Sequence, residues 1–317
     1  MAACRMSDII HQHIPVLLRE AVENLITSPA GVYVDATFGR GSHSSEILKN
    51  LNASGRLIAF DKDPEAIAYA KQHIHDDRFS IVHASFASLQ FILQGLGVWE
   101  GVSGILFDLG VSSPQLDNPE RGFSFVREGK LDMRMDTSQG TNAMQWLADI
   151  DETELANVLW LYGEEKFSRR IARAIVTARS VQPITTTAQL AEIITRAIPV
   201  KKPKDKHAAT RSFQAIRIAV NQELSDLESA LPQALDALQA GGRLAVISFH
   251  SLEDRIVKQF IRSHEKGEEL PHGLPIKGSH FQAKLKSVGK PVKAGLRELN
   301  HNPRARSAIM RIAEKQT

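Results

Sequence analysis

The sequence predicts an α/β protein with a parallel, doubly wound sheet, interrupted by a mostly helical region. Three observations support this prediction. Short runs of β-forming residues alternate with helical segments up to about residue 111. This rhythm stops over residues 112–209 and resumes at about residue 210. We therefore expect a discontinuous domain made of residues 1–111 and 210–317, with residues 112–209 inserted between its halves.

Each element of the first half follows from its local pattern. Apolar residues at helical spacing over residues 14–27 predict an amphipathic helix before the first strand, which ends at Asp35. Asp63 and Pro64 predict a helix start, because aspartate caps a first turn and proline fits into it. The remaining elements are helices at about 44–51, at about 64–74 and up to Gly95, and strands at 56–61, 79–86 and 104–110.

The interrupting region has little β pattern. A turn-rich loop is expected directly after residue 112, and Pro183 and Pro199 separate helical segments. These helices are predicted at 141–161, 164–180 and 187–198. The second half of the sheet domain then contains a long helix from about Thr210 with a break tolerated at Pro232, a fifth strand at 243–249, a helix from Ser251 and a terminal strand at 307–315.

Composition excludes several classes of protein. The chain has 317 residues, of which 43% are hydrophobic and 24% charged, as in soluble globular proteins. No apolar run approaches the roughly 18 residues of a membrane span, and the N-terminus lacks the pattern of a signal peptide, so a cytoplasmic protein with no membrane partner is expected. Cys4 is the only cysteine, which excludes a disulfide framework, and no metal site is predicted. The sequence leaves open a homodimer.

Positive charge is concentrated in the interrupting region. Residues 164–211 contain 11 lysines and arginines and four acids, whereas the whole chain has a net charge of +3. A basic surface on an otherwise mildly acidic body is typical of proteins with a polyanionic partner, although any single lysine there equally fits a solvated loop. The cluster favours nucleic acid, and the candidate RNA-binding residues are Lys201, Lys202, Lys204, Lys206 and Arg211.

The stretch from Val32 to His43 predicts a ligand-binding turn. A strand that ends at Asp35 leads into Gly39 and Gly41, and a helix follows. Glycines let the backbone approach a ligand closely, and the helix start offers unpaired N–H groups. The spacing lacks the third glycine of the dinucleotide motif and the lysine of a P-loop, so neither of those sites is expected.

Four further residues are expected near this turn, because ligands of open α/β sheets bind beyond the carboxyl ends of the strands. Asp61 ends the second strand, about twenty residues after the turn, where an acid accepts ribose hydroxyls. Its alternative role is to cap the next helix, but Asp63 is better placed for that, so Asp61 is expected to be free for a ligand. Phe86 either lies against an adenine or belongs to the core. Together with Asp35 and the glycine turn, Asp108 and Gln115 complete the predicted crevice.

The fourth strand is followed by a Ser-Pro loop that resembles the loop of amino-group methyltransferases. Such enzymes hold an amine nitrogen, a methyl carbon and a sulfur in line, and accept amine hydrogens on oxygen atoms. The candidate groups here are Ser112, Ser113, the carbonyl before Pro114, and Asp108. Gln115 and Leu116 stand where the consensus has a proline and an aromatic residue, so base stacking is expected from elsewhere. The candidates for stacking are Phe123, Phe125 and Phe249.

The segment after the fifth strand has one candidate catalytic residue. His250 is either a base or a polar residue at the rim of the sheet. Ser251 and Asp254 have the spacing of a capping box, which favours a structural role for Ser251.

Eleven motifs between His13 and Ala308 together resemble the family of ribosomal RNA small subunit methyltransferases H. They are HIPVLLREAV, DATFGRGSHS, FDKDPEAI, DLGVSSPQLD, RGFSF, LDMRMD, YGEE, RIARAIV, ATRSFQAIRIAVN, ISFHSLEDRIVK and NPRARSA. The resemblance implies a Rossmann-like class I S-adenosylmethionine-dependent methyltransferase domain with an inserted, mostly helical domain for substrate recognition. It implies methylation of a cytosine N4 in the 16S rRNA of the small ribosomal subunit, in the decoding centre near the P site.

The resemblance also implies which residues bind the cofactor. They are Gly41, Ser42, His43, Asp61, Phe86, Asp108 and Gln115. Ser42 stands where the family usually has glycine, and a serine fits only if the turn needs no positive φ at that position.

Two other functions remain open from the sequence. One is methylation of another amine, in a different nucleic acid or in a protein glutamine, because those enzymes have variants of the same Ser-Pro loop. The other is a non-catalytic RNA-binding or ribosome-assembly protein, which the basic region would also fit. Asp61 and Asp108 favour an enzyme, because a protein that only binds RNA does not need them.

Overall fold

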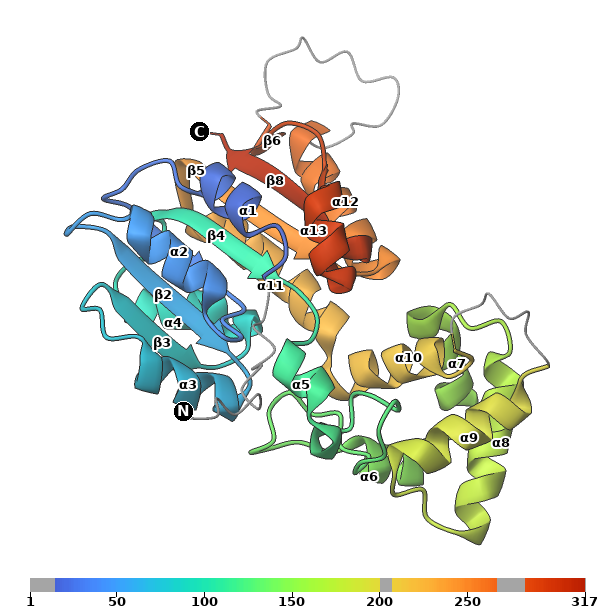
Figure 1. Cartoon of the computed structure of the whole chain (residues 1–317). Helices are drawn as coiled ribbons and strands as arrows, with labels where there is room; N and C mark the ends of the chain where they lie inside the picture. The colour runs from blue at the N-terminus through green and yellow to red at the C-terminus, as the bar shows by residue number, and fades with distance from the viewer. Residues whose placement is uncertain (1–14, 200–206, 267–282, 317) are drawn as a thin grey trace, which may run out of the picture.

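A twisted, mostly parallel sheet forms one lobe of the molecule and a bundle of helices forms the other (Figure 1). The computed structural model describes residues 15–199, 207–266 and 283–316. We call the first lobe the sheet lobe; it contains all the strands and helices α1–α4 and α11–α13. We call the second lobe the helical lobe; it contains helices α6–α10. The predicted α/β fold class with a helical insertion is confirmed, and the sheet lobe is Rossmann-like.

The strand order of the sheet is β3-β2-β1-β4-β5-β8-β6, with β7 paired to β8. Strands β1 to β5 run parallel to one another, and β8 is antiparallel to β5. The order reverses between β1 and β4, which is where doubly wound sheets bind ligands. The bounds are β1 Val32–Asp35, β2 Arg56–Asp61, β3 Phe79–His83, β4 Val102–Asp108, β5 Leu238–Ser248, β6 Leu285–Ser287, β7 Val292–Lys293 and β8 Ile309–Lys315.

Both faces of the sheet are covered by helices, which explains the continuous apolar runs of its strands. In β4, Ile105 and Phe107 belong to one core with helices α4 (Leu89–Gly95), α11 (Glu223–Ala237) and α12 (Ser251–Lys266). Leu106, between them, faces the opposite core with α1 (Leu18–Leu25) and α2 (Ser42–Asn50). Successive side chains of a strand point to opposite faces, so one run fills both cores.

The helical lobe has a core of its own. Its helices are α6 (Ala143–Asp149), α7 (Glu152–Gly163), α8 (Ser168–Val181), α9 (Thr187–Ala197) and α10 (Thr210–Asn221). Leu159, Ile171, Ile194 and Ile216 from four of these helices are buried together. The predicted domain boundary at residue 209 stays a prediction, and the packing of α10 on α7 favours a boundary after Asn221.

Three predicted elements differ in the structure. The long helix from Thr210 breaks at Gln222, where φ is 55°, and Pro232 lies inside α11. The third strand ends at His83, so Phe86 instead begins the 3-10 helix η1 (Phe86–Ser88), which the side chain of Ser85 caps. The loop after residue 112 contains the short helix α5 (Ser113–Asp117) and the 3-10 helix η2 (Pro119–Arg121).

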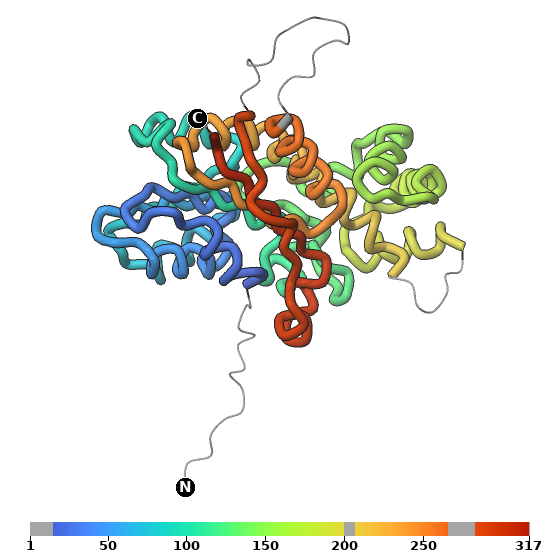
Figure 2. The backbone as a smooth tube through the Cα atoms, turned by 90° about the horizontal axis from the view of Figure 1, so that it is seen from above, coloured from blue at the N-terminus to red at the C-terminus, as the bar shows by residue number. Residues whose placement is uncertain are grey.

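The remaining helices are α3, which follows the second strand, and two short helices near the C-terminus. Helix α3 (Pro64–His73) begins as predicted, with the Asp63 side chain accepting the Glu65 N–H. Helix α13 (Leu296–His301) and η3 (Pro303–Ser307) precede β8. Figure 2 shows the C-terminal segment as one continuous red run across the molecule. Among the helices of the described ranges, none has the length and apolar character to cross a membrane.

Candidate active site

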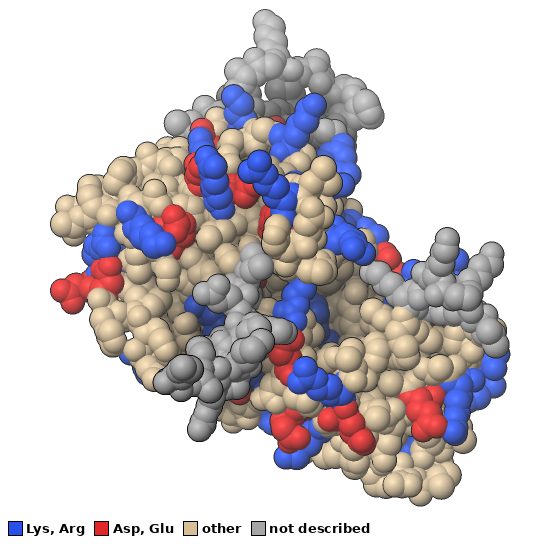
Figure 3. Space-filling model, in the orientation of Figure 1, with Lys and Arg blue, Asp and Glu red and all other residues tan. Residues whose placement is uncertain are grey.

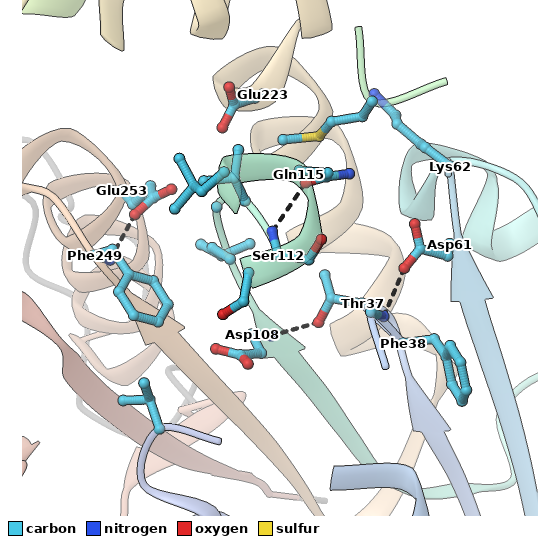
Figure 4. A pocket seen from close by; sticks show the side chains of 18 of the residues that line it. Thr37, Phe38, Asp61, Lys62, Asp108, Ser112, Gln115, Glu223, Phe249 and Glu253 are labelled. Atoms are coloured by element: carbon cyan, nitrogen blue, oxygen red, sulfur yellow. Dashed lines mark hydrogen bonds between the residues drawn. The ribbon is translucent and has the colours of Figure 1, made fainter. Parts of the chain in front are cut away.

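A cavity of about 380 Å³ lies at the carboxyl ends of the central strands, with α5, α10 and η3 also contributing to its walls (Figure 4). Such a volume is within the usual range for small-molecule sites. Most of the residues that the sequence proposes line it: Ser42, His43, Asp61, Phe86, Asp108, Ser112, Ser113 and Gln115. Gly41 and Pro114 are not among the lining residues.

The glycine turn closes one side of the cavity. Gly39 and Gly41 have positive φ values of 56° and 72°, and a Cβ on Gly41 would lie 2.6 Å from the ring of Phe38. Gly41 is the N-cap of α2, and Ser42 is the first residue of that helix. Because the left-handed conformation falls on the two glycines, serine is accommodated at position 42 without strain.

Asp61 is already a hydrogen-bond acceptor in the turn, contrary to the expectation that it is free. Its Oδ2 accepts the Gly39 N–H at 2.7 Å, and its Oδ1 accepts the Asp63 N–H at 2.8 Å. Burial raises its pKa to about 6, although these two amides oppose the shift. A carboxylate has about four lone-pair sites, so two are left for ligand hydroxyls.

Asp108 and His43 form the polar floor of the cavity. Asp108 N–H donates to Thr37 Oγ1 at 2.6 Å, and its Oδ2 lies 3.5 Å from His43 Nδ1. His43 Nε2 lies 3.2 Å from the Val16 carbonyl, so this nitrogen is the donor and Nδ1 faces the carboxyl group. Burial, together with the charges of Asp35 and Glu253, raises the pKa of Asp108 well above its usual value. Asp108 Oδ1 is buried without a hydrogen-bond partner among the described residues.

Asp35 supports the turn from below rather than lining the cavity. Its fully buried carboxylate accepts the Ser44 hydroxyl at 2.6 Å and the Thr37 N–H at 3.2 Å. Burial raises its pKa to about 6 despite these hydrogen bonds. Asp35 therefore fastens β1 to α2.

The Ser-Pro segment is a helix start and not an extended loop. Ser112 N–H donates to Gln115 Oε1 at 2.9 Å, and Gln115 Nε2 donates to Asp63 Oδ2 at 2.8 Å. The Ser112 carbonyl accepts the Leu116 N–H at 3.2 Å. Since the first-turn carbonyls of a helix point along its axis, the serine hydroxyls are the better-placed acceptors for a substrate amine. The Ser113 hydroxyl accepts a hydrogen bond from Arg304 Nη1.

A cluster of three charged side chains, Arg217, Glu223 and Glu253, lines the cavity wall opposite the glycine turn. The sequence motifs did not indicate this cluster. Arg217 and Glu223 form a pair at 2.7 and 2.8 Å, and the Glu253 carboxylate accepts the Phe249 N–H at 2.7 Å. Burial alone would raise the pKa of Glu253, but the neighbouring His250 and Arg217 hold it below its usual value.

The predicted capping box at Ser251 is wrong. Glu253 accepts the N–H of Phe249 and of His250, so the box lies one residue earlier than the predicted pair of Ser251 and Asp254. His250 lines the cavity, with Nε2 3.1 Å from Glu253 Oε1. Its role as a base stays a prediction.

Of the three phenylalanines proposed for stacking, Phe249 alone lines the cavity. Phe125 packs on Phe213 in the helical lobe at 4.7 Å between ring centroids, and Phe123 is buried. Phe86 lines the cavity and packs edge-on against Phe107, while its contact with an adenine stays a prediction.

The predicted RNA-binding lysines, Lys201, Lys202, Lys204 and Lys206, lie outside the described residues. Arg211 is exposed on α10 and donates to the Glu164 carbonyl at 3.2 Å. Its predicted contact with RNA stays a prediction.

Comparison with known proteins supports a methylase. The model of the MraW methylase family matches residues 10–316. The chain is 55% identical to the ribosomal RNA small subunit methyltransferase H of Pseudoalteromonas atlantica, over 96% of this chain and 98% of that protein, and also 55% identical to that of Legionella pneumophila, over 96% and 99%. A solved rRNA methylase from Streptococcus thermophilus aligns with 95% of this chain and 94% of its own, at 13% identity and a TM-score of 0.41. On the match of the family model and these identities, the chain belongs to the MraW methylase family.

Proposed function

We propose that this protein methylates the N4 amino group of a cytosine in 16S rRNA, in the decoding centre of the small ribosomal subunit. S-adenosylmethionine is the methyl donor, and the substrate would place the activity in the cytoplasm. The observation that supports the proposal best is the position of Asp108 and the Ser113 hydroxyl in one cavity. This arrangement sets an acid for the cofactor beside an acceptor for an amine.

The described residues fit this cofactor. Asp61 has two lone pairs left for the ribose hydroxyls, Phe86 offers a ring face to an adenine, and Asp108 has an unpartnered buried oxygen for a methionine amino group. When bound, S-adenosylmethionine supplies a strongly electrophilic methyl group. The glycine turn offers backbone N–H groups at the start of α2.

The remaining residues would position the base. The Ser113 hydroxyl would hold a hydrogen of the exocyclic amine, whose lone pair is delocalised into the ring and must be turned toward the methyl group. Phe249 would stack on the base. The pair formed by His250 and Glu253 lies in the same wall and is a candidate for taking up the released proton.

A direct test uses labelled cofactor with three substrates: small ribosomal subunits, naked 16S rRNA, and ribosomal protein. We expect label in the RNA, and digestion to nucleosides should yield N4-methylcytidine. Label in protein, or in another base, would replace the proposal with methylation of a different amine. Cofactor binding without transfer to any of the three would favour a non-catalytic role.

Asp61→Ala should weaken cofactor binding by roughly 1–3 kcal/mol, the range for a hydrogen bond to a charged group. The loss arises because the ribose hydroxyls lose their acceptor. Isothermal titration calorimetry measures the change, and Asp151→Ala, an exposed helix cap on the other lobe, is the control. Equal affinities for Asp61→Ala and the parent protein would remove Asp61 from the ribose site.

Cofactor affinity should also fall below pH 6. The raised pKa of Asp61, about 6, means that the free protein binds a proton there at lower pH, whereas the ribose hydroxyls require the charged carboxylate. Affinity should therefore be complete about one unit above pH 6, half its full value at pH 6, and fall by up to about tenfold for each pH unit below it. Asp61→Asn should lose the part of this dependence that Asp61 contributes, while the titrations of Asp35 and Asp108 remain in both proteins. If the cofactor affinities of Asp61→Asn and the parent protein changed with pH in parallel, the assignment of Asp61 to the ribose would be contradicted.

A further inference from the structure

The C-terminal part of the sheet lobe has a large excess of positive charge. Residues 284–311 contain eight lysines and arginines and a single acid, Glu298. Glu298 is used inside the fold, since its Oε1 accepts the Leu17 N–H at 2.8 Å. Lysines and arginines outnumber acids by the same count here as in residues 164–211, although this segment is much shorter.

Most of these cations lack an internal partner. Arg304 pairs with Asp117 at 2.8 Å, and Arg311 pairs with Asp254 at 2.7 Å. The other six are exposed and form no ion pair with any residue of the described ranges: Lys284, Lys286, Lys290, Lys293, Arg297 and Arg306. Like charges along one segment repel each other, so this arrangement is unfavourable unless an anion binds.

Exposed cations elsewhere in the fold more often have an acid beside them. Arg19 pairs with Glu23 on α1, and Lys49 pairs with Glu46 on α2. On the helical lobe, Arg196 pairs with Glu192. Such acids are scarce in residues 284–311, where Glu298 is the single one.

These side chains connect two hollows. At one end, Arg304 and Ser307 line the main cavity. At the other end, Lys290 and Arg311 join Lys258 and Arg262 of α12 around a second hollow of about 100 Å³. Figure 3 shows cations over this part of the sheet lobe, where α12, α13 and β6 lie in Figure 1. We call this set the C-terminal basic strip: Lys258, Arg262, Lys290, Lys293, Arg297, Arg304 and Arg306.

We propose that the C-terminal basic strip binds the phosphates of the RNA segment that flanks the methylated nucleotide. The proposal rests on the function proposed above and adds a surface on the sheet lobe that holds the substrate. Residues 284–311 contain no aromatic residue, so the strip suits a sugar–phosphate backbone and not stacked bases. RNA is favoured over an acidic protein because the strip leads into the cavity that the target base must enter.

The test is a triple variant, Lys290→Ala/Lys293→Ala/Arg297→Ala, none of whose residues lines the main cavity. The matched control removes the same charge elsewhere on the sheet lobe, as Arg19→Ala/Lys49→Ala/Lys71→Ala. Binding of a single-stranded 16S rRNA fragment is measured across a salt series. Each phosphate contact contributes about 0.7 to the slope of log K against log salt, so the strip variant should lower the slope by about 2, and the control should not. Calorimetry with S-adenosylmethionine should give the parent affinity for both.

Each outcome has one meaning. A strip variant with the parent slope, or with the same decrease as the control, would overturn the proposal, as would polyglutamate that binds the parent more tightly than the RNA fragment does and loses this affinity in the strip variant. Binding is measured without methyl transfer, so it separates the two proposals. A parent that binds RNA through the strip but methylates no cytosine would overturn the proposed function alone.

Discussion

Asp63→Ala should lower the free energy of unfolding by about 3–5 kcal/mol, the usual effect of removing one partner from a buried ion pair. Asp63 and Arg121 are almost completely buried and pair at 2.8 Å. The same carboxylate caps α3 through the Glu65 N–H and accepts Gln115 Nε2. The substitution therefore leaves a buried guanidinium without its main partner, and it also removes one of the contacts that hold α5 against the sheet lobe.

Two variants separate the contributions to this effect. Asp151→Ala removes only a solvent-exposed helix cap, of α7, and should cost about 1 kcal/mol in the same urea titration. The double variant Asp63→Ala/Arg121→Met should recover part of the loss, because no buried charge is left unpaired. If Asp63→Ala is no worse than Asp151→Ala, the ion pair contributes nothing, and Glu65, 3.3 Å from Arg121, compensates for its loss.

The sheet could be predicted because its strands are buried on both faces. Burial on both sides leaves apolar runs such as Ile105 to Phe107, and these stand out without knowledge of the partner strands. Asp63 and Pro64 indicate a helix start through local chemistry alone. In contrast, Gln222 has no such local pattern, and the helix breaks there in a left-handed conformation that a sequence pattern does not reveal.

The site could be predicted only where it lies at strand ends. Asp61 and Asp108 end parallel strands, so topology alone brings them to one edge of the sheet. Arg304 reaches Ser113 from 191 residues away in the sequence, and no local pattern encodes that meeting. The same holds for Arg217, because its place in the cavity wall depends on how the helical lobe, which contains α10, lies against the sheet lobe.

Ser113→Ala should slow methyl transfer by about ten-fold to a thousand-fold at saturating cofactor, if the hydroxyl holds the substrate amine in the transition state. Its position in the cavity wall, at the start of α5, motivates this prediction. Cofactor affinity should be normal, because Ser113 is not among the cofactor-binding residues. Single-turnover rates on small ribosomal subunits measure the step directly. Asp108→Asn should show the complementary defect, a loss of cofactor affinity that high cofactor concentration restores.

The hydrogen bond between Ser113 and Arg304 offers a second explanation for a slow Ser113→Ala enzyme, and the rates of further variants distinguish the two explanations. If the hydroxyl only fastens α5 to the C-terminal segment, then Arg304→Ala should cause the same loss of rate, and the double variant should be no slower than either single one. If the hydroxyl holds the amine, Arg304→Ala should cost less at saturating small ribosomal subunits, where the RNA affinity of the C-terminal basic strip does not limit the rate, and the effects of the two substitutions should largely add. A Ser113→Ala enzyme as fast as the parent would exclude the side chain from the reaction. The acceptor would then be sought among the backbone carbonyls of this segment, in particular that of Ser113 before Pro114, or in the wall formed by His250 and Glu253.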